Sequence, residues 1–167
     1  RPWRNSSTKD VSRMDTVLER DSNKTAIGPM ALWAALCSQI RDFNPDYVVL
    51  VARKMPRLFD AVQLDLGRSA ICISDQAVPF VRSELANARV AIVDDLWNAG
   101  STMLHVKERV ECAKPRAVKL FALGAKDAAS ALTQDVCMAE VTSLGEARYE
   151  HFVSMVPNIL RNISKPY

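Results

Sequence analysis

Short, unbroken apolar runs separated by helical patterns are the feature that most restricts the fold of this chain. The clearest run is Tyr47 to Val51, which reads YVVLV. A strand without polar alternation is typically buried on both faces, as in a parallel sheet. Similar runs recur at Ser69 to Ile73, Arg89 to Val93, Ala117 to Leu123 and, more briefly, Val136 to Val141.

Helical patterns lie between these runs. Apolar residues recur near a 3.6-residue period over 29 to 42, which begins with a proline suited to a first helical turn. We also expect helices over Leu58 to Leu66, Pro79 to Ala86, Ser101 to Cys112 and Gly145 to Asn162. Gly124 to Gln134 is expected to be a loop, with or without one helical turn. The alternation predicts an α/β fold with a mostly parallel central sheet flanked by helices.

Length and composition predict one domain with an ordinary core. The 167 residues are 49% hydrophobic and 25% charged. A net charge of +3 is too small to argue for nucleic-acid binding, although it does not exclude it. The four cysteines lack CxxC spacing, which favours buried free thiols and a cytoplasmic setting. The apolar runs are too short to span a membrane.

Residues 1–25 are polar and mixed in charge, which predicts a solvated arm or linker; the alternative is a lid over a site. The remaining residues, 26–167, form the expected domain. The chain begins at Arg1 rather than Met and ends after a basic tail. We therefore expect a domain excised from a longer chain, with a further domain outside it.

The segment Ala91 to Thr102, AIVDDLWNAGST, combines a strand, two acids and a helix start. Free N–H groups and the positive end of a helix dipole bind phosphate. Carboxylates at the end of a strand suit sugar hydroxyls or a metal ion. The candidate acids are Asp94 and Asp95, and the candidate phosphate loop is Asn98, Ala99, Gly100, Ser101 and Thr102.

A second candidate segment follows the first apolar run. Residues 52–57 carry Arg53 and Lys54 at the carboxyl end of a predicted strand, where α/β sheets bind ligands. The alternative is a solvated loop, and the residues alone do not decide between the two.

With these residues in place, the chain resembles a divergent type I phosphoribosyltransferase over roughly residues 27 to 125. The resemblance implies that Asp94 and Asp95 hold the ribose hydroxyls of phosphoribosyl pyrophosphate, directly or through Mg²⁺. It implies that residues 98–102 bind the 5-phosphate, and that Arg53 and Lys54 contact the pyrophosphate. It also implies a homodimer, which is common in the family.

Three residue patterns depart from the family. Asn98 stands where purine-salvage members have an aspartate, and an amide cannot serve as a general base. Only Ser74 to Ala88 separates two strands between which the family carries a mobile basic hairpin. Trp97 is large for the variable part of the loop, and either packs onto the fold or offers a stacking face to a base.

The sequence therefore predicts an enzyme that transfers phosphoribose from phosphoribosyl pyrophosphate, with Mg²⁺, to a nitrogenous acceptor that no motif identifies. The alternative is a non-catalytic domain of the same fold that senses a nucleotide or regulates a partner. A third alternative is an interaction domain in which the acids are merely solvated.

Overall fold

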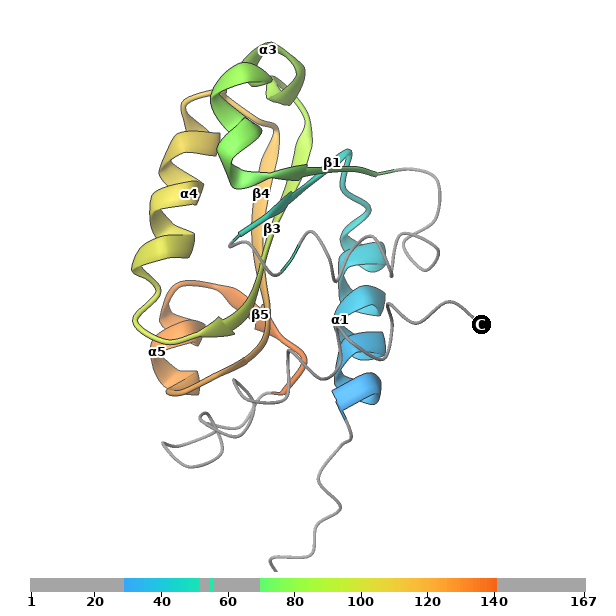
Figure 1. Ribbon diagram of the computed structural model, residues 1–167, viewed down its shortest axis with the longest axis vertical. Helices are drawn as coiled ribbons and strands as arrows, with labels where there is room; N and C mark the ends of the chain where they lie inside the picture. The colour runs from blue at the N-terminus through green and yellow to red at the C-terminus, as the bar shows by residue number, and fades with distance from the viewer. Residues whose placement is uncertain (1–28, 52–54, 56–69, 141–167) are drawn as a thin grey trace, which may run out of the picture.

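The computed structural model describes residues 29–51, 55 and 70–140, which form a sheet with helices on both faces (Figure 1). The strands are β1 (Tyr47–Leu50), β2 (Ile71–Ser74), β3 (Arg89–Trp97), β4 (Ala117–Ala125) and β5 (Val136–Met138). All pairings are parallel, and the strand order is β2-β1-β3-β4-β5. The predicted α/β class with a parallel central sheet is confirmed.

Helices cover the sheet in two layers. The helix α1 (Pro29–Phe43) lies on one face, and α4 (Ser101–Glu111) and α5 (Ala128–Thr133) lie on the other (Figure 1). The α1 face buries Leu32, Trp33 and Leu36 together with Val93 and Phe121 of the sheet. The opposite face buries Met103 and Val106 of α4 with Ile92 and Leu120. Each layer thus has its own core, and β3 contributes to both.

The helix-to-strand connections share one backbone device. Each contains a single non-glycine residue with a positive φ: Asn44 (50°), Asn87 (60°), Lys114 (56°) and Asp135 (56°). A left-handed residue is a common way to end a helix, because it turns the chain while satisfying the last carbonyl groups. Asparagine and aspartate tolerate this conformation best, so Lys114 is the unusual member of the group.

The expected helix over Pro79 to Ala86 is wrong. The chain instead forms the 3₁₀ helix η1 (Asp75–Phe80) and one short turn, α3 (Arg82–Leu85). The Ser74 side chain caps η1 by accepting a hydrogen bond from the N–H of Gln76, so the helical structure starts directly after β2. Pro79 therefore lies inside η1 rather than at a helix start.

Strand β3 was predicted to stop at Val93, but it runs on through both acids to Trp97. Strand β4 likewise extends to Ala125 instead of stopping at Leu123. The expected loop after it contains α5, which Asp127 caps by accepting from the N–H groups of Ala129 and Ser130. The last strand ends at Met138, earlier than predicted.

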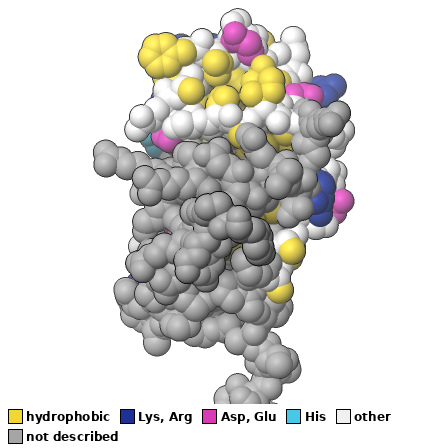
Figure 2. All heavy atoms as spheres, turned by 45° about the vertical axis from the view of Figure 1, so that its right-hand side comes forward, with side chains coloured by type: hydrophobic (Ala, Val, Ile, Leu, Met, Phe, Trp, Pro, Cys, Tyr) yellow, Lys and Arg dark blue, Asp and Glu magenta, His cyan; other side chains and the backbone are white. Residues whose placement is uncertain are grey.

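The predictions for residues 1–25, 58–66 and 145–162 lie outside the described residues. In the described part of the chain, no helix is long and apolar enough to cross a membrane. The cysteines there are free thiols, as predicted, but their predicted burial holds only for Cys37: Cys72 and Cys137 are partly buried and Cys112 is exposed. Figure 2 shows hydrophobic side chains at the upper end of the molecule, where η1 and α3 lie in Figure 1. Phe80 of η1 is 86% exposed.

Candidate functional site

The two candidate acids lie where the carboxyl ends of three strands meet. Ser74, Leu50 and Val93 occupy one row of the sheet, so the next residues, Asp75 and Asp94, follow at the same edge. Strand β1 ends in this row, with the N–H of Val51 donating to the carbonyl of Val93. Beyond it β3 continues beside β4. The acids therefore sit at the carboxyl edge of the sheet, where parallel α/β sheets bind ligands.

The two acids interrupt the regular pleat of β3. The Asp94 carboxylate accepts a hydrogen bond from the N–H of Asp95 (2.8 Å), and the Asp95 carboxylate accepts one from the N–H of Leu96 (2.8 Å). Side-chain oxygens that bind nearby N–H groups compete with the strand ladder. Accordingly, Asp95 is not paired with a residue of β4, although the pairs on both sides of it keep the same register.

The interruption changes which face each later side chain occupies. Val93 and Leu96 both belong to the core on the α1 face, although they are three residues apart. Ile92 and Trp97, five residues apart, both belong to the core on the α4 face. Strict alternation would place the members of each pair on opposite faces. The alternation of side chains is therefore broken around the two acids, although the register of β3 against β4 is the same on both sides of them, and Trp97 packs on the α4 face.

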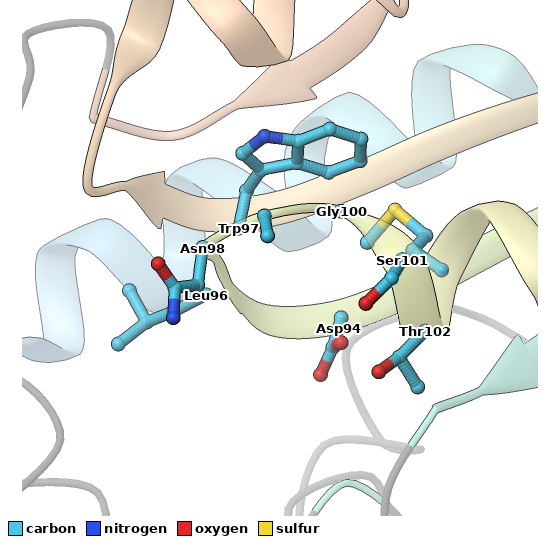
Figure 3. Close-up of a pocket in the computed structure, with 9 residues that line it drawn as sticks. Asp94, Leu96, Trp97, Asn98, Gly100, Ser101 and Thr102 are labelled. Carbon is cyan, nitrogen blue, oxygen red and sulfur yellow. The ribbon is translucent and has the colours of Figure 1, made fainter.

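A cavity of about 240 Å³ opens over this end of β3. Its lining consists of one acid, the whole predicted phosphate loop and three apolar side chains: Asp94, Asn98, Ala99, Gly100, Ser101, Thr102, Leu96, Trp97 and Met103. Figure 3 shows the Asp94 carboxylate and the Ser101 and Thr102 hydroxyls directed toward the same space. The Asn98 amide points away from them. The structure therefore brings the predicted loop and one of the two predicted acids together.

Asp95 does not line this cavity. The Asp95 carboxylate accepts a hydrogen bond from the N–H of Leu96, and it also interacts with the Asp94 carboxyl. Asp94 lines the cavity and Asp95 interacts with Asp94, and the role of both acids in holding ribose hydroxyls stays a prediction. Arg53 and Lys54 lie outside the described residues.

The phosphate loop ends at an open helix N-terminus. Gly100 is the N-cap of α4, with φ 75°, and no side chain caps the helix. The first bond of α4 runs from the N–H of Leu104 to the carbonyl of Gly100 (2.9 Å). The N–H groups of Ser101, Thr102 and Met103 precede it and have no acceptor within the helix. Anions bind such groups readily.

Burial and the neighbouring Asp95 carboxylate raise the pKa of Asp94 to about 8, and Asp75 adds to the effect. A carboxyl in this setting binds a proton or a cation more strongly than an exposed one, because either removes the unfavourable charge. Asp75 itself is paired with Arg109 of α4, at 4.0 Å between Oδ2 and Nη1. Arg109 also donates to the Asp75 carbonyl (3.1 Å).

The donor set fits magnesium in type. Mg²⁺ is commonly bound by one or two carboxylates together with substrate phosphates and water. In the described residues, no group of three or more His, Cys, Asp or Glu side chains could hold a metal ion by itself. A cation here would therefore depend on Asp94 and on oxygen atoms that a ligand brings.

Trp97 packs in the core, so its side chain does not present a stacking face. It is 2% exposed and belongs to the α4-face core. Figure 3 shows its ring across the loop from the Asp94, Ser101 and Thr102 oxygens. Of the two readings of Trp97, packing is the one that the structure supports.

Sequence reasoning missed two charged residues near the site. Asp75 was visible as an acid after a predicted strand, but its distance along the chain hid its position beside Asp94. Arg109 gave no signal, because a single arginine on a helix surface is ordinary. Their hydrogen bond and ion pair connect η1 to α4. They lie in the segment between β2 and β3, where the family carries a mobile hairpin.

No protein-family model matches the chain, and no curated protein matches its sequence. Solved structures do. The HGPRT-ase of Leishmania tarentolae in complex with GMP has 19% identity and a TM-score of 0.48, over 62% of this chain and 71% of that one. A purine phosphoribosyltransferase from Pyrococcus horikoshii has 21% identity and a TM-score of 0.45, over 59% and 75%.

The hypoxanthine-guanine phosphoribosyltransferase of Schistosoma mansoni in complex with IMP has 15% identity and a TM-score of 0.48, over 60% of this chain and 58% of that one. All three are phosphoribosyltransferases. This is the family that the motif at residues 91–102 resembles. At identities of this size, a likeness concerns the course of the chain and not the chemistry of its site.

Proposed function

We propose that this domain binds phosphoribosyl pyrophosphate or a related ribose 5-phosphate ligand, with Mg²⁺, and transfers phosphoribose to a nitrogenous acceptor. The observation that carries the proposal is the single cavity wall shared by Asp94 and residues 98–102. An acid and an open helix N-terminus side by side suit a ligand that has hydroxyl groups at one end and a phosphate at the other.

In this proposal the loop and Asp94 bind different parts of the ligand. The N–H groups at the start of α4 and the hydroxyls of Ser101 and Thr102 hold the 5-phosphate. Asp94 holds the ribose hydroxyls and stabilises positive charge on the sugar as the bond from the anomeric carbon to pyrophosphate breaks. Mg²⁺ would be held by Asp94 and ligand oxygens and would neutralise the leaving pyrophosphate.

The acceptor nitrogen forms the new bond to the anomeric carbon and gives up a proton. Asn98 cannot receive that proton, since an amide is not basic, and its side chain points away from the Asp94, Ser101 and Thr102 oxygens (Figure 3). The proposal therefore favours an acceptor that needs no base at this position over a 6-oxopurine.

A non-catalytic sensor of the same ligand is the second candidate. The connection between β2 and β3 favours this candidate. It consists of η1 and α3, and Arg109 of α4 donates a hydrogen bond to the carbonyl of Asp75 in η1. A sensor has no need to exclude water from a reacting sugar, so it has no need of a closing hairpin.

Calorimetric titration with phosphoribosyl pyrophosphate and Mg²⁺ tests the binding, and pyrophosphate release with a panel of bases tests the transfer. We expect Asp94→Asn to weaken Mg²⁺-dependent binding by about tenfold or more, because the variant loses one charge-assisted contact. Asp135→Asn is the matched control, since it makes the same change at an exposed turn with a positive φ that asparagine tolerates.

Binding without turnover on any base would select the sensor. No binding by the unmodified protein, or equal binding by the two variants, would rule out the proposed site.

A further inference from the structure

The inference concerns Trp97 and its contact with the phosphate loop. A Cβ atom built on Gly100 would lie 2.1 Å from Cζ2 and 2.2 Å from Cη2 of the Trp97 ring. The indole therefore packs directly on the Cα of Gly100, leaving no room for a side chain. Gly100 also has a φ of 75°, which other residues rarely adopt. Contact and backbone angle thus require glycine independently.

The backbone and side chain of Trp97 are both held by neighbouring elements, so its ring can restrict the position of Gly100. Its backbone is in register with Ala125 of β4, and its carbonyl accepts a hydrogen bond from the N–H of Lys126 (2.9 Å). Its side chain shares the α4-face core with Met103 and Val106. The indole is held by the sheet on one side and by α4 on the other.

The loop itself has little else to hold it. Asn98 and Ala99 are exposed, and the N-cap of α4 makes no side-chain hydrogen bond. Glycine reaches left-handed and right-handed conformations about equally well, so an unsupported Gly100 would let the loop sample several shapes. A ring packed on one side of Gly100 removes that freedom.

We propose that Trp97 is a positioning residue that holds the 98–102 loop in the shape that receives a phosphate group. This inference rests on the proposed function. A site ordered before the ligand arrives loses less conformational entropy on binding, so its affinity is higher. Trp97 supplies that order through its contact with Gly100, because it is 2% exposed and its ring lies across the loop from the Asp94, Ser101 and Thr102 oxygens (Figure 3).

Trp97→Phe tests this directly. Phenylalanine keeps a buried aromatic side chain but lacks the outer part of the indole that reaches Gly100. With inorganic phosphate and ribose 5-phosphate as probes in calorimetry, we expect affinity to fall about tenfold. Trp33→Phe is the matched control, because Trp33 is 3% exposed in the core of the α1 face, away from the loop. It should lose similar thermal stability and keep its affinity.

A double-mutant cycle with Gly100→Ala adds a measurement that general destabilisation would not move. In the parent the new methyl group meets the indole, whereas in the Trp97→Phe background that clash is relieved and only the backbone strain remains. The two losses of affinity should therefore fall clearly short of additive in the double variant. Additive losses would overturn the inference.

Fluorescence keeps the inference testable even if Trp97→Phe folds poorly. The chain has three tryptophans, so replacing Trp3 and Trp33 with phenylalanine leaves Trp97 as the only reporter. Because the loop is ordered before the ligand arrives, the emission should be that of a buried indole without phosphate and should change little at saturation. A large change of emission on binding, or unchanged affinity in folded Trp97→Phe, would overturn the role of Trp97 and leave the proposed function standing. Failure of the parent to bind either probe would instead overturn the proposed function.

Discussion

At the scale of single residues, Asp94 is the side chain whose chemistry depends most on its surroundings. Its pKa is raised from 3.8 to about 8, first by burial and then by Asp95. Between these values the folded chain keeps a proton that the unfolded chain releases. The stability that this proton contributes is fully present below pH 3.8 and is lost as the pH rises toward 8.

We therefore predict that Asp94→Asn, which mimics the protonated form, flattens the dependence of stability on pH. Between pH 5 and 8, in metal-free buffer, the parent should lose about 2 kcal/mol relative to the variant. This is less than the full shift implies, because a half-buried carboxylate is partly screened by water. Urea unfolding at each pH measures the difference. A parallel pH dependence in the two proteins would contradict the raised pKa.

At the scale of elements, the left-handed helix ends offer a test at Lys114. Its φ of 56° costs an L-residue with a side chain roughly 1–2 kcal/mol, whereas glycine adopts it freely. We predict that Lys114→Gly raises the free energy of unfolding by about 0.5–1 kcal/mol, after the greater freedom of glycine in the unfolded chain is subtracted. Thermal unfolding followed by circular dichroism measures this change.

Lys107→Gly is the matched control for Lys114→Gly. Lys107 lies inside α4, where glycine costs about 1 kcal/mol, and its ion pair with Glu111 at 3.6 Å is largely exposed and contributes little. The same substitution should therefore stabilise the chain at one end of the helix and destabilise it in the middle. A loss at both positions would show that the side chain of Lys114 matters more than its backbone angle.

Several features of these elements could be predicted from the sequence because their causes are local. The run at residues 47–51 is apolar enough to require burial on both faces, and the sequence around Gly100 marks a turn into a helix. The extension of β3 through Asp94 and Asp95 could not be predicted, because aspartate is depleted in strands and its place here depends on pairing with β4. Helix α5 fits the alternative of a helical turn within residues 124–134, and Asp127 before an alanine-rich segment is the N-cap signal that marks its start.

At the scale of the molecule, the sequence did not predict which residues far apart in the chain lie close together in the fold. The α/β class followed from alternation alone, but the order β2-β1-β3-β4-β5 brings Asp75 to the same edge as Asp94, close enough to affect its pKa, and no local pattern encodes that. The fate of Trp97 was undecided for the same reason. Its burial follows from the break in side-chain alternation around the two acids, and that break becomes visible only when both core faces are known.

The same arrangement makes a prediction about cooperativity. The two core layers lie on opposite faces of one sheet, and β3 supplies neighbouring side chains to both: Ile92 to the α4 face and Val93 to the α1 face. Both side chains are 0% exposed. Neither layer can lose its helices and leave β3 intact, so we expect the layers to unfold together.

We predict that Ile92→Ala lowers the free energy of unfolding by about 3–4 kcal/mol and Val93→Ala by about 2–3 kcal/mol, each through a single transition. Ile71→Ala, on the edge strand β2 where the side chain is 56% exposed, should cost less than about 1 kcal/mol. Scanning calorimetry and circular dichroism should give coincident transitions in all three variants. Two separated transitions in Val93→Ala would mean that the α1 layer can unfold alone, and that the sheet does not join the two cores into one unit.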